Sequence, residues 1–257
     1  MTDPADSLSL LREIVTAVDS GDPVVLATVV ETGHATPTHG GAKMLVYGDG
    51  RSSGTVGGGA VEAVVTADAL EAIDAGRGRL AHYDLEQLGM CPGELTVYLE
   101  PHLPPPTVLV IGCGHVGRAV VELAHWAGFR VVAVDDRPEL VTRKLLPDAD
   151  ELFAGPPAET LARIRFTERT HAVVTTRNTD IDLELLPLLL AEPIGSIGVL
   201  GSKRRWERTR TALLAGGLAA EQLGRVKTPI GLDLGARTPR EIALSILAEL
   251  LTLRPRT

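Results

Sequence analysis

A short apolar run, a glycine-rich turn, a helical pattern and a second apolar run constrain the fold of this chain most strongly. Residues 107–136 read TVLVIGCGHVGRAVVELAHWAGFRVVAVDD. The first apolar run ends in Gly112, Gly114 and Gly117, and the second ends in Asp135. This order of strand, glycine turn, helix, strand and acid is typical of a dinucleotide-binding βαβ unit. It predicts a Rossmann-like fold for this part of the chain.

Each glycine of the turn has its own role in such a unit. Gly112 permits the tight turn, Gly114 lets a pyrophosphate approach the backbone, and Gly117 lets the helix pack close to the sheet. The start of the helix offers unpaired N–H groups to a phosphate. Asp135 lies 21 residues after Gly114, close to the spacing of a ribose-binding carboxylate. The pattern predicts NAD(P) as a candidate ligand, and the alternative is that the glycines only form a tight turn.

The alternation of short strands and helices continues after this unit. It predicts a parallel sheet with right-handed crossovers, whose ligand crevice lies beyond the carboxyl ends of the strands. The motif TPRE at 238–241 combines an N-cap residue, a proline at the first helical position and an acid at the third. Strands are expected at 151–153, 171–176 and 197–200, and helices at 158–164, 180–190, 204–214 and 238–250.

The N-terminal region has a different organisation, and a proline-rich segment separates it from the rest. Residues 103–106 (LPPP) predict a stiff, extended linker. We therefore expect a smaller α+β domain at residues 1–103 and a Rossmann-like domain with a parallel sheet at 104–257, an α/β chain overall. The N-terminal elements expected are helices near 8–18 and 60–75, strands at 24–30 and 80–83, a hairpin at 43–56 and an edge strand at 95–100.

Composition and charge exclude several classes of function. The formal net charge is −8, which argues against nucleic acid or an anionic membrane as the main partner. Aromatic residues make up only 3%, too few for base-stacking platforms. The first residues lack the basic segment of a signal peptide, and no apolar run reaches the roughly 18 residues of a membrane span. Two distant cysteines imply no disulfide framework, so we expect a reduced, cytoplasmic protein.

Two features of the N-terminal region are candidates for chemistry. Gly57, Gly58 and Gly59 lead directly into a helix, so bare backbone N–H groups could cradle an anion there. The alternative is a hairpin-to-helix turn that needs positive φ angles. Cys91 lies in a turn beside Pro92, where its thiol could be exposed, although a free cysteine is more often a small buried hydrophobe.

A basic run marks a second candidate anion contact in the C-terminal region. Ser202 and Arg204 belong to the sequence GSKRR at 201–205, which follows an expected strand and opens an expected helix. Three cations at this junction could contact an anion, whereas such a run is more often a solvated helix face. The sequence contains no Ser/His/Asp order, paired-carboxylate motif, HExxH or CxxC, so no catalytic residue is predicted.

With these motifs assembled, the chain resembles the XdhC/CoxI family, accessory proteins that mature molybdenum-containing xanthine and carbon monoxide dehydrogenases. The resemblance extends from about residue 24 to 250. The family's Cys-Gly-Gly turn is partly matched, because Pro92 lies between Cys91 and Gly93. Some members have a second cysteine where this chain has Ala60. The matching stretches are ATV at 27–29, GAKM at 41–44, the Gly-Gly-Gly-x-x-Glu loop at 57–62, IGCGHVGRA at 111–119, VDDRPE at 134–139, GSKRR at 201–205 and TPIGLDLGARTPREIALSILAEL at 228–250.

The resemblance implies a maturation factor rather than an enzyme. Such a protein carries molybdenum cofactor as cargo, assists its sulfuration with a cysteine desulfurase, and passes it to an apo molybdenum hydroxylase of the xanthine dehydrogenase type. Cys91 would be the soft ligand to molybdenum or a sulfur-handling thiol. A dithiol mechanism is not expected with Ala60. The predicted cofactor-binding residues are Gly57, Gly58, Gly59, Glu62, Cys91, Gly112, Gly114, Gly117, Asp135, Ser202 and Arg204.

Two other classes of function remain open at this point. An NAD(P)-dependent oxidoreductase would use the Rossmann-like domain, and Asp135 with Asp136 would favour NAD, since carboxylates repel a 2′-phosphate. A dinucleotide-sensing interaction module is the third class. A homodimer is also expected, because the edge strand at 95–100 would need a cover.

Overall fold

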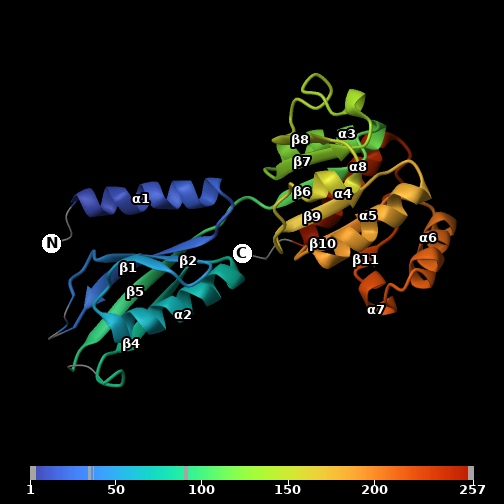
Figure 1. Cartoon of the computed structure of the whole chain (residues 1–257). Helices are drawn as coiled ribbons and strands as arrows, with labels where there is room; N and C mark the ends of the chain where they lie inside the picture. Colours follow the sequence, from blue (N-terminus) through green and yellow to red (C-terminus); the bar gives the residue numbers. More distant parts are fainter. Residues whose placement is uncertain (1–3, 34–35, 37, 90–91, 254–257) are drawn as a thin grey trace. The chain divides into compact units, whose positions relative to one another are not determined.

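The computed structural model describes residues 4–33, 36, 38–89 and 92–253, and the chain divides into two compact units (Figure 1). The first runs to Pro104, and the second begins at Pro105. The predicted α/β class is confirmed, with a parallel, Rossmann-like sheet in the C-terminal unit and a separate antiparallel sheet before it. Among the described residues, no helix combines the length and the apolar character that crossing a membrane requires.

The N-terminal unit is an antiparallel sheet of five strands in the order β3-β2-β1-β5-β4. Alternate residues of β1 face opposite sides, so Val25 packs with residues of α2 and Val24 packs with residues of α1. The two helices therefore cover opposite faces (Figure 1). The elements are α1 (Pro4–Asp19), β1 (Val24–Thr32), β2 (Lys43–Tyr47), β3 (Ser52–Gly54), α2 (Gly59–Ala75), β4 (Arg79–Asp84) and β5 (Glu94–His102).

The prediction of an edge strand at residues 95–100 is wrong. This segment lies in β5, which pairs with β1 on one side and β4 on the other. Leu95, Val97 and Leu99 are buried, while Tyr98 between them is 37% exposed. The alternation therefore reflects one solvent-exposed face of an interior strand. The argument for a homodimer that rested on this edge is lost.

The C-terminal unit is a parallel sheet of six strands in the order β8-β7-β6-β9-β10-β11. The chain returns to the centre between β8 and β9, as in the 3-2-1-4-5-6 order of Rossmann folds. The elements are β6 (Thr107–Ile111), α3 (His115–Trp126), β7 (Arg130–Asp135), the 3-10 turn Pro138–Leu140, β8 (Glu151–Ala154), α4 (Pro157–Leu161), β9 (Thr170–Val174), α5 (Thr179–Ala191), β10 (Ser196–Val199), α6 (Lys203–Ala215), α7 (Ala220–Leu223), β11 (Val226–Lys227) and α8 (Pro239–Thr252).

Helices cover both faces of this sheet, so its central strand is apolar along its length. Val108 and Val110 of β6 pack with residues of α3 and α8. Leu109 and Ile111 pack on the other face with residues of α4, α5 and α6. A strand buried on both faces reads as a continuous apolar run, which is why residues 108–111 contain no polar residue.

Candidate functional site

The glycine turn after β6 has the geometry that its sequence predicts. Gly112 has a φ of +105°, and a Cβ added there would lie 2.6 Å from the carbonyl carbon of Thr175. A Cβ added at Gly117 would lie 1.9 Å from the carbonyl oxygen of Gly112. Gly114 precedes α3 as its N-cap, and a Cβ there would meet no heavy atom within 4 Å. Packing therefore requires the first and third glycines, while the second leaves open space at the start of α3.

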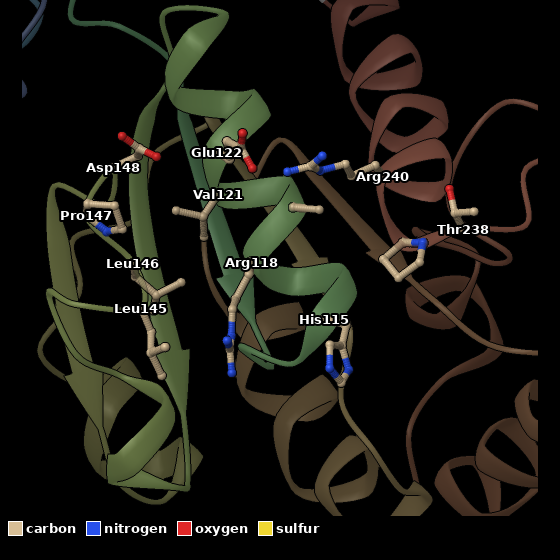
Figure 2. Close-up of a pocket in the computed structure, with 12 residues that line it drawn as sticks. His115, Arg118, Val121, Glu122, Leu145, Leu146, Pro147, Asp148, Thr238 and Arg240 are labelled. Atoms are coloured by element: carbon tan, nitrogen blue, oxygen red, sulfur yellow. The ribbon is translucent and has the colours of Figure 1, made fainter.

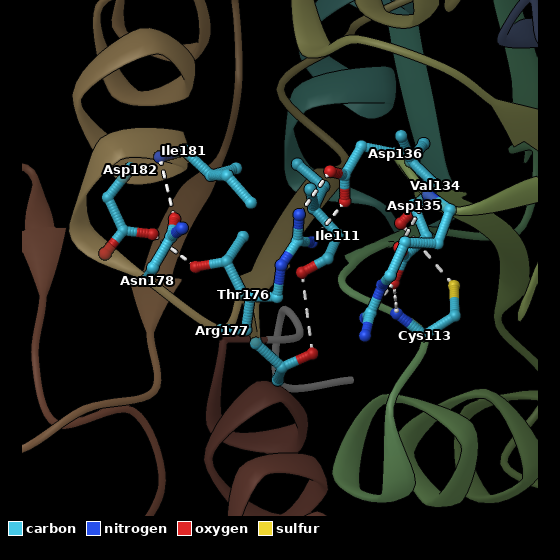
Figure 3. Close-up of polar contacts among 12 residues, drawn as sticks. Ile111, Cys113, Val134, Asp135, Asp136, Thr176, Arg177, Asn178, Ile181 and Asp182 are labelled. Atoms are coloured by element: carbon cyan, nitrogen blue, oxygen red, sulfur yellow. Dashed lines mark hydrogen bonds and ion pairs between the residues drawn. The ribbon is translucent and has the colours of Figure 1, made fainter.

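Asp135, the expected ribose ligand, is 3% exposed and already has protein partners (Figure 3). Its Oδ2 accepts a hydrogen bond from the backbone N–H of Cys113 at 2.6 Å. Both of its oxygens also accept hydrogen bonds from the guanidinium of Arg137, at 2.8 and 2.9 Å. Hydrogen bonding to Asp135 raises the pKa of Arg137. A ribose could reach this carboxylate only if the Arg137 side chain moved.

A second ion pair stands beside the first. The guanidinium of Arg177 donates two hydrogen bonds to the carboxylate of Asp136, at 2.5 and 2.6 Å (Figure 3). These bonds hold the pKa of Asp136 below its usual value. Both pairs line the crevice at the carboxyl ends of β6 and β7, whose free volume is only about 10 Å³. That volume is about the minimum for one water molecule, so the geometry gives no support to a bound NAD(P).

Arg205 joins the loops at the carboxyl edge of the sheet, whereas the sequence predicts it only as one of three cations that could contact an anion. Its guanidinium forms an ion pair with Asp182 at 2.5 Å and donates to the carbonyl oxygens of Thr176 and Asn178, both at 2.9 Å. The Asp182 side chain is 1% exposed and also accepts a hydrogen bond from the hydroxyl of Thr176. No spacing rule predicts this pair, because Arg205 and Asp182 lie 23 positions apart in the chain.

The two residues predicted beside Arg205 have other roles. Ser202 is the N-cap of α6, and its hydroxyl accepts a hydrogen bond from the N–H of Arg205 at 3.2 Å. Arg204 is exposed and forms no hydrogen bond or ion pair within the described ranges. Anion binding by these two residues stays a prediction.

The segment between β11 and α8 is fixed by side chains of α8. Glu249 is 6% exposed, accepts a hydrogen bond from the N–H of Gly231 at 2.7 Å, and forms an ion pair with Lys227 at 2.8 Å. The hydroxyl of Ser245 donates to the carbonyl oxygen of Leu232. The stretch TPIGLDLGARTPREIALSILAEL (residues 228–250) therefore contains both the loop and the helix that anchors the loop.

The capping motif at the start of α8 is confirmed. The hydroxyl of Thr238 accepts from the N–H of Glu241 at 3.3 Å, and the carboxylate of Glu241 accepts from the N–H groups of Thr238 and Arg237 at 2.9 and 2.8 Å. The backbone hydrogen bonds from Thr238 and Arg237 lower the pKa of Glu241. The cap fixes the point at which α8 begins and therefore positions its first exposed residues.

The Gly57–Gly59 turn in the N-terminal unit combines strain with open space. Gly57 and Gly58 have φ angles of +139° and +110°, so the turn itself requires glycine, as the alternative interpretation expected. An added Cβ at Gly58 or Gly59 would meet no heavy atom within 4 Å. Glu62 reaches back to this turn, where its Oε1 accepts hydrogen bonds from the Thr55 hydroxyl at 2.5 Å and the Gly58 N–H at 3.3 Å. The Glu62 carboxylate thus accepts a hydrogen bond from one of the backbone N–H groups that were predicted to bind an anion.

The two cysteines differ in what the structure says of them. Cys91, the predicted molybdenum ligand, lies outside the described residues. Cys113 is fully buried, and burial raises the pKa of its thiol to about 12. It is therefore an inert packing residue rather than a nucleophile. Within the described ranges, no group of three or more His, Cys, Asp or Glu side chains is placed to hold a metal ion.

Two family models match the chain, one in each half. The model described as the XdhC Rossmann domain matches residues 108–250, more than half of the chain. The model described as the XdhC and CoxI family matches residues 17–84. The two matches leave out only the ends and the segment from 85 to 107.

Curated relatives cover the chain unevenly. Uncharacterized protein YqeB of Escherichia coli (strain K12) is 31% identical over 254 residues, which are 96% of this chain and 46% of the relative. A probable xanthine dehydrogenase subunit of Bacillus subtilis (strain 168) is 33% identical over 153 residues, 60% of this chain and 44% of the relative. The chain thus spans about half the length of these two proteins.

A third relative matches along almost its whole length. Molybdenum cofactor insertion chaperone PaoD of Escherichia coli (strain K12) is 28% identical over 292 residues, which cover 97% of this chain and 89% of the relative. A crystal structure from Bacillus halodurans, described as a xanthine dehydrogenase, has a TM-score of 0.53 and 23% identity over 95% of both chains. At that identity the structural similarity concerns the fold alone.

Proposed function

The chain belongs to the XdhC and CoxI family, and from this premise we propose that it carries molybdenum cofactor to a xanthine-dehydrogenase-type molybdenum hydroxylase. One observation carries the proposal. The alignment with the molybdenum cofactor insertion chaperone PaoD includes 97% of this chain and 89% of that protein, so both units have counterparts in it. The relative from Bacillus subtilis, whose name is that of a probable xanthine dehydrogenase component, supports the choice of client.

The Gly57–Gly59 turn is the first proposed contact with the cargo. Molybdenum cofactor is anionic through the phosphate of its pterin, and the open space at Gly58 and Gly59 lets such a group approach the backbone. The carboxylate of Glu62 accepts a hydrogen bond from the Gly58 N–H in its absence. Cargo binding would replace this carboxylate by the phosphate, which makes Glu62 a competitor that favours release.

Cys91 is the second proposed contact, on the basis of the family resemblance. Its thiolate would ligate molybdenum or handle sulfur, the latter together with a cysteine desulfurase. With Ala60 in place of a second cysteine, one thiol acts alone. The oxidoreductase alternative has no support in the crevice, which the Arg137 and Arg177 ion pairs fill.

Retention of the cargo tests this proposal. The purified chain is incubated anaerobically with molybdenum cofactor, and molybdenum per chain is measured after gel filtration. We expect about one per chain for the wild type, and at least tenfold less for Gly58→Asp, whose carboxylate repels the phosphate, and for Cys91→Ala.

Gly50→Asp is the matched control for the loop variant. Gly50 also has a positive φ of +84° and open space around its Cβ position, but it lies in the hairpin between β2 and β3. It should retain as much molybdenum as the wild type. Failure of the wild type to retain cofactor would refute the carrier function. Equal retention by all four proteins would refute the Gly57–Gly59 turn and Cys91 as the contacts with the cargo.

A further inference from the structure

We propose that a groove on the C-terminal unit binds a phosphate ester of a planar heterocycle that carries the 2-amino-4-oxopyrimidine edge. The groove lies between residues 115–122 of α3, residues 145–148 and residues 238–240 at the start of α8 (Figure 2). Its volume is about 780 Å³, within the range of small-molecule sites. It shares no lining residue with the closed crevice beside Asp135. We call it the α3–α8 groove.

An arginine and a histidine at the start of α3 fit a phosphate. Arg118 is held by a hydrogen bond from its Nε to the carbonyl oxygen of Cys113 at 3.3 Å. The terminal nitrogens of its guanidinium have no hydrogen bond or ion pair in the part of the chain that the structure describes, and they remain available to an anion. His115 lies beside it on the same helix and also lines the groove (Figure 2). A guanidinium and an imidazole together suit a phosphate ester.

The middle of the groove fits a planar ring. Leu145 and Pro147 form an apolar wall on one side, and the buried Leu146 and Val121 lie behind it. Arg240 enters from α8, is exposed, and forms no ion pair within the described ranges. Its guanidinium points toward α3 in Figure 2, where it could stack on the face of a bound ring.

Two carboxylates select the edge of the ring. Glu122 and Asp148 line the groove, and neither forms a hydrogen bond or ion pair elsewhere in the described part of the chain. A carboxylate is an acceptor with two oxygens, so it matches adjacent N–H and amino donors. Guanine and pterin share such an edge, whereas adenine presents an acceptor nitrogen beside its amino group. The ligand is therefore a guanine nucleotide, because the proposed function places the phosphate of the pterin cargo at the Gly57–Gly59 turn and not in this groove.

Calorimetric titration of the full chain with 5′-GMP tests the assignment. We expect saturable binding of 5′-GMP and at least tenfold weaker binding of 5′-AMP, guanosine and inorganic phosphate. Glu122→Gln and Arg240→Glu should each weaken 5′-GMP binding at least tenfold. Both residues are exposed, so these variants should fold, which circular dichroism checks. Arg237→Glu is the matched control, an exposed arginine just outside the groove, and should bind 5′-GMP like the wild type.

Cofactor retention by the same variants separates the groove from the site of the cargo. Loss of 5′-GMP alone in the groove variants would support a nucleotide site, and loss of both ligands would overturn it by placing the phosphate of the cargo in the groove. Binding of 5′-GMP without any cofactor retention by the wild type would refute the proposed function and leave the groove assignment standing. Absence of 5′-GMP binding, equal binding of 5′-AMP, or insensitivity to Glu122→Gln and Arg240→Glu would overturn the groove assignment, even if cofactor is retained.

Discussion

Replacing Gly117 by alanine is expected to destabilise the C-terminal unit by about 3 kcal/mol or more. The new Cβ would lie 1.9 Å from the carbonyl oxygen of Gly112, a contact that no rotamer change can relieve. That oxygen is itself fixed, because it accepts a hydrogen bond from the hydroxyl of Thr175 at 2.6 Å. Relief therefore requires α3 to move away from the sheet, which opens the core between α3 and β6.

Urea unfolding of the C-terminal unit measures this effect, and Gly114→Ala is its control. The added Cβ at Gly114 meets no heavy atom within 4 Å, so the loss of stability should stay below about 1 kcal/mol, the cost of a poorer N-cap. Equal stability of Gly117→Ala and wild type would mean that α3 does not pack against the turn in this way.

Replacing Asp182 by alanine is expected to cost about 3–5 kcal/mol, because it breaks a buried ion pair and leaves one partner behind. The Asp182 side chain is 1% exposed and the Arg205 side chain 22% exposed. Without Asp182, the guanidinium loses its counter-charge, and the Thr176 hydroxyl loses its acceptor. The loops that Arg205 joins should loosen along the carboxyl edge of the sheet.

Chemical denaturation measures the loss of stability, and hydrogen exchange of the native protein measures the loosening of the loops. Asp180→Ala is the control, since Asp180 lies in the same first turn of α5 but is exposed, and its loss should cost about 0.5 kcal/mol or less. The double variant Asp182→Ala with Arg205→Met should be less destabilised than Asp182→Ala alone, since it leaves no unpaired charge. A small effect of Asp182→Ala would contradict the role we give to Arg205.

The glycine turn shows how far local sequence constrains structure. Gly112 and Gly117 were predicted to serve a tight turn and close packing, and the positive φ of the first and the blocked Cβ position of the second agree with those roles. Such requirements are local or lie within one βαβ unit, so spacing reveals them. The capping motif at Thr238 and Glu241 was visible for the same reason.

Contacts that join distant segments were not visible in the sequence. Arg177 pairs with Asp136 across 41 positions, whereas the sequence pattern predicts that Asp136 helps to select NAD. No spacing rule links these two residues. They meet because β7 and β9, the strands that precede them, lie on either side of β6. The crevice that the motif predicts is present, but side chains from two loops fill it.

The misassigned edge strand has a different physical origin. Alternation of apolar and polar residues reports that one face of a strand is exposed, and says nothing about its neighbours in the sheet. Within the N-terminal unit, α1 packs against β1, β2 and β3, which leaves the outer face of β5 to solvent. An interior strand therefore carried the pattern expected of an edge.

Transfer of the cargo tests the carrier function most directly. The chain is loaded with sulfurated molybdenum cofactor, freed of excess by gel filtration, and mixed in air with an apo molybdenum hydroxylase of the xanthine dehydrogenase type. Free sulfurated cofactor at the same molybdenum concentration serves as the comparison. We predict that the loaded chain restores at least tenfold more hydroxylase activity than free cofactor. Equal activity from both, or less from the loaded chain, would contradict a carrier that protects its cargo and delivers it.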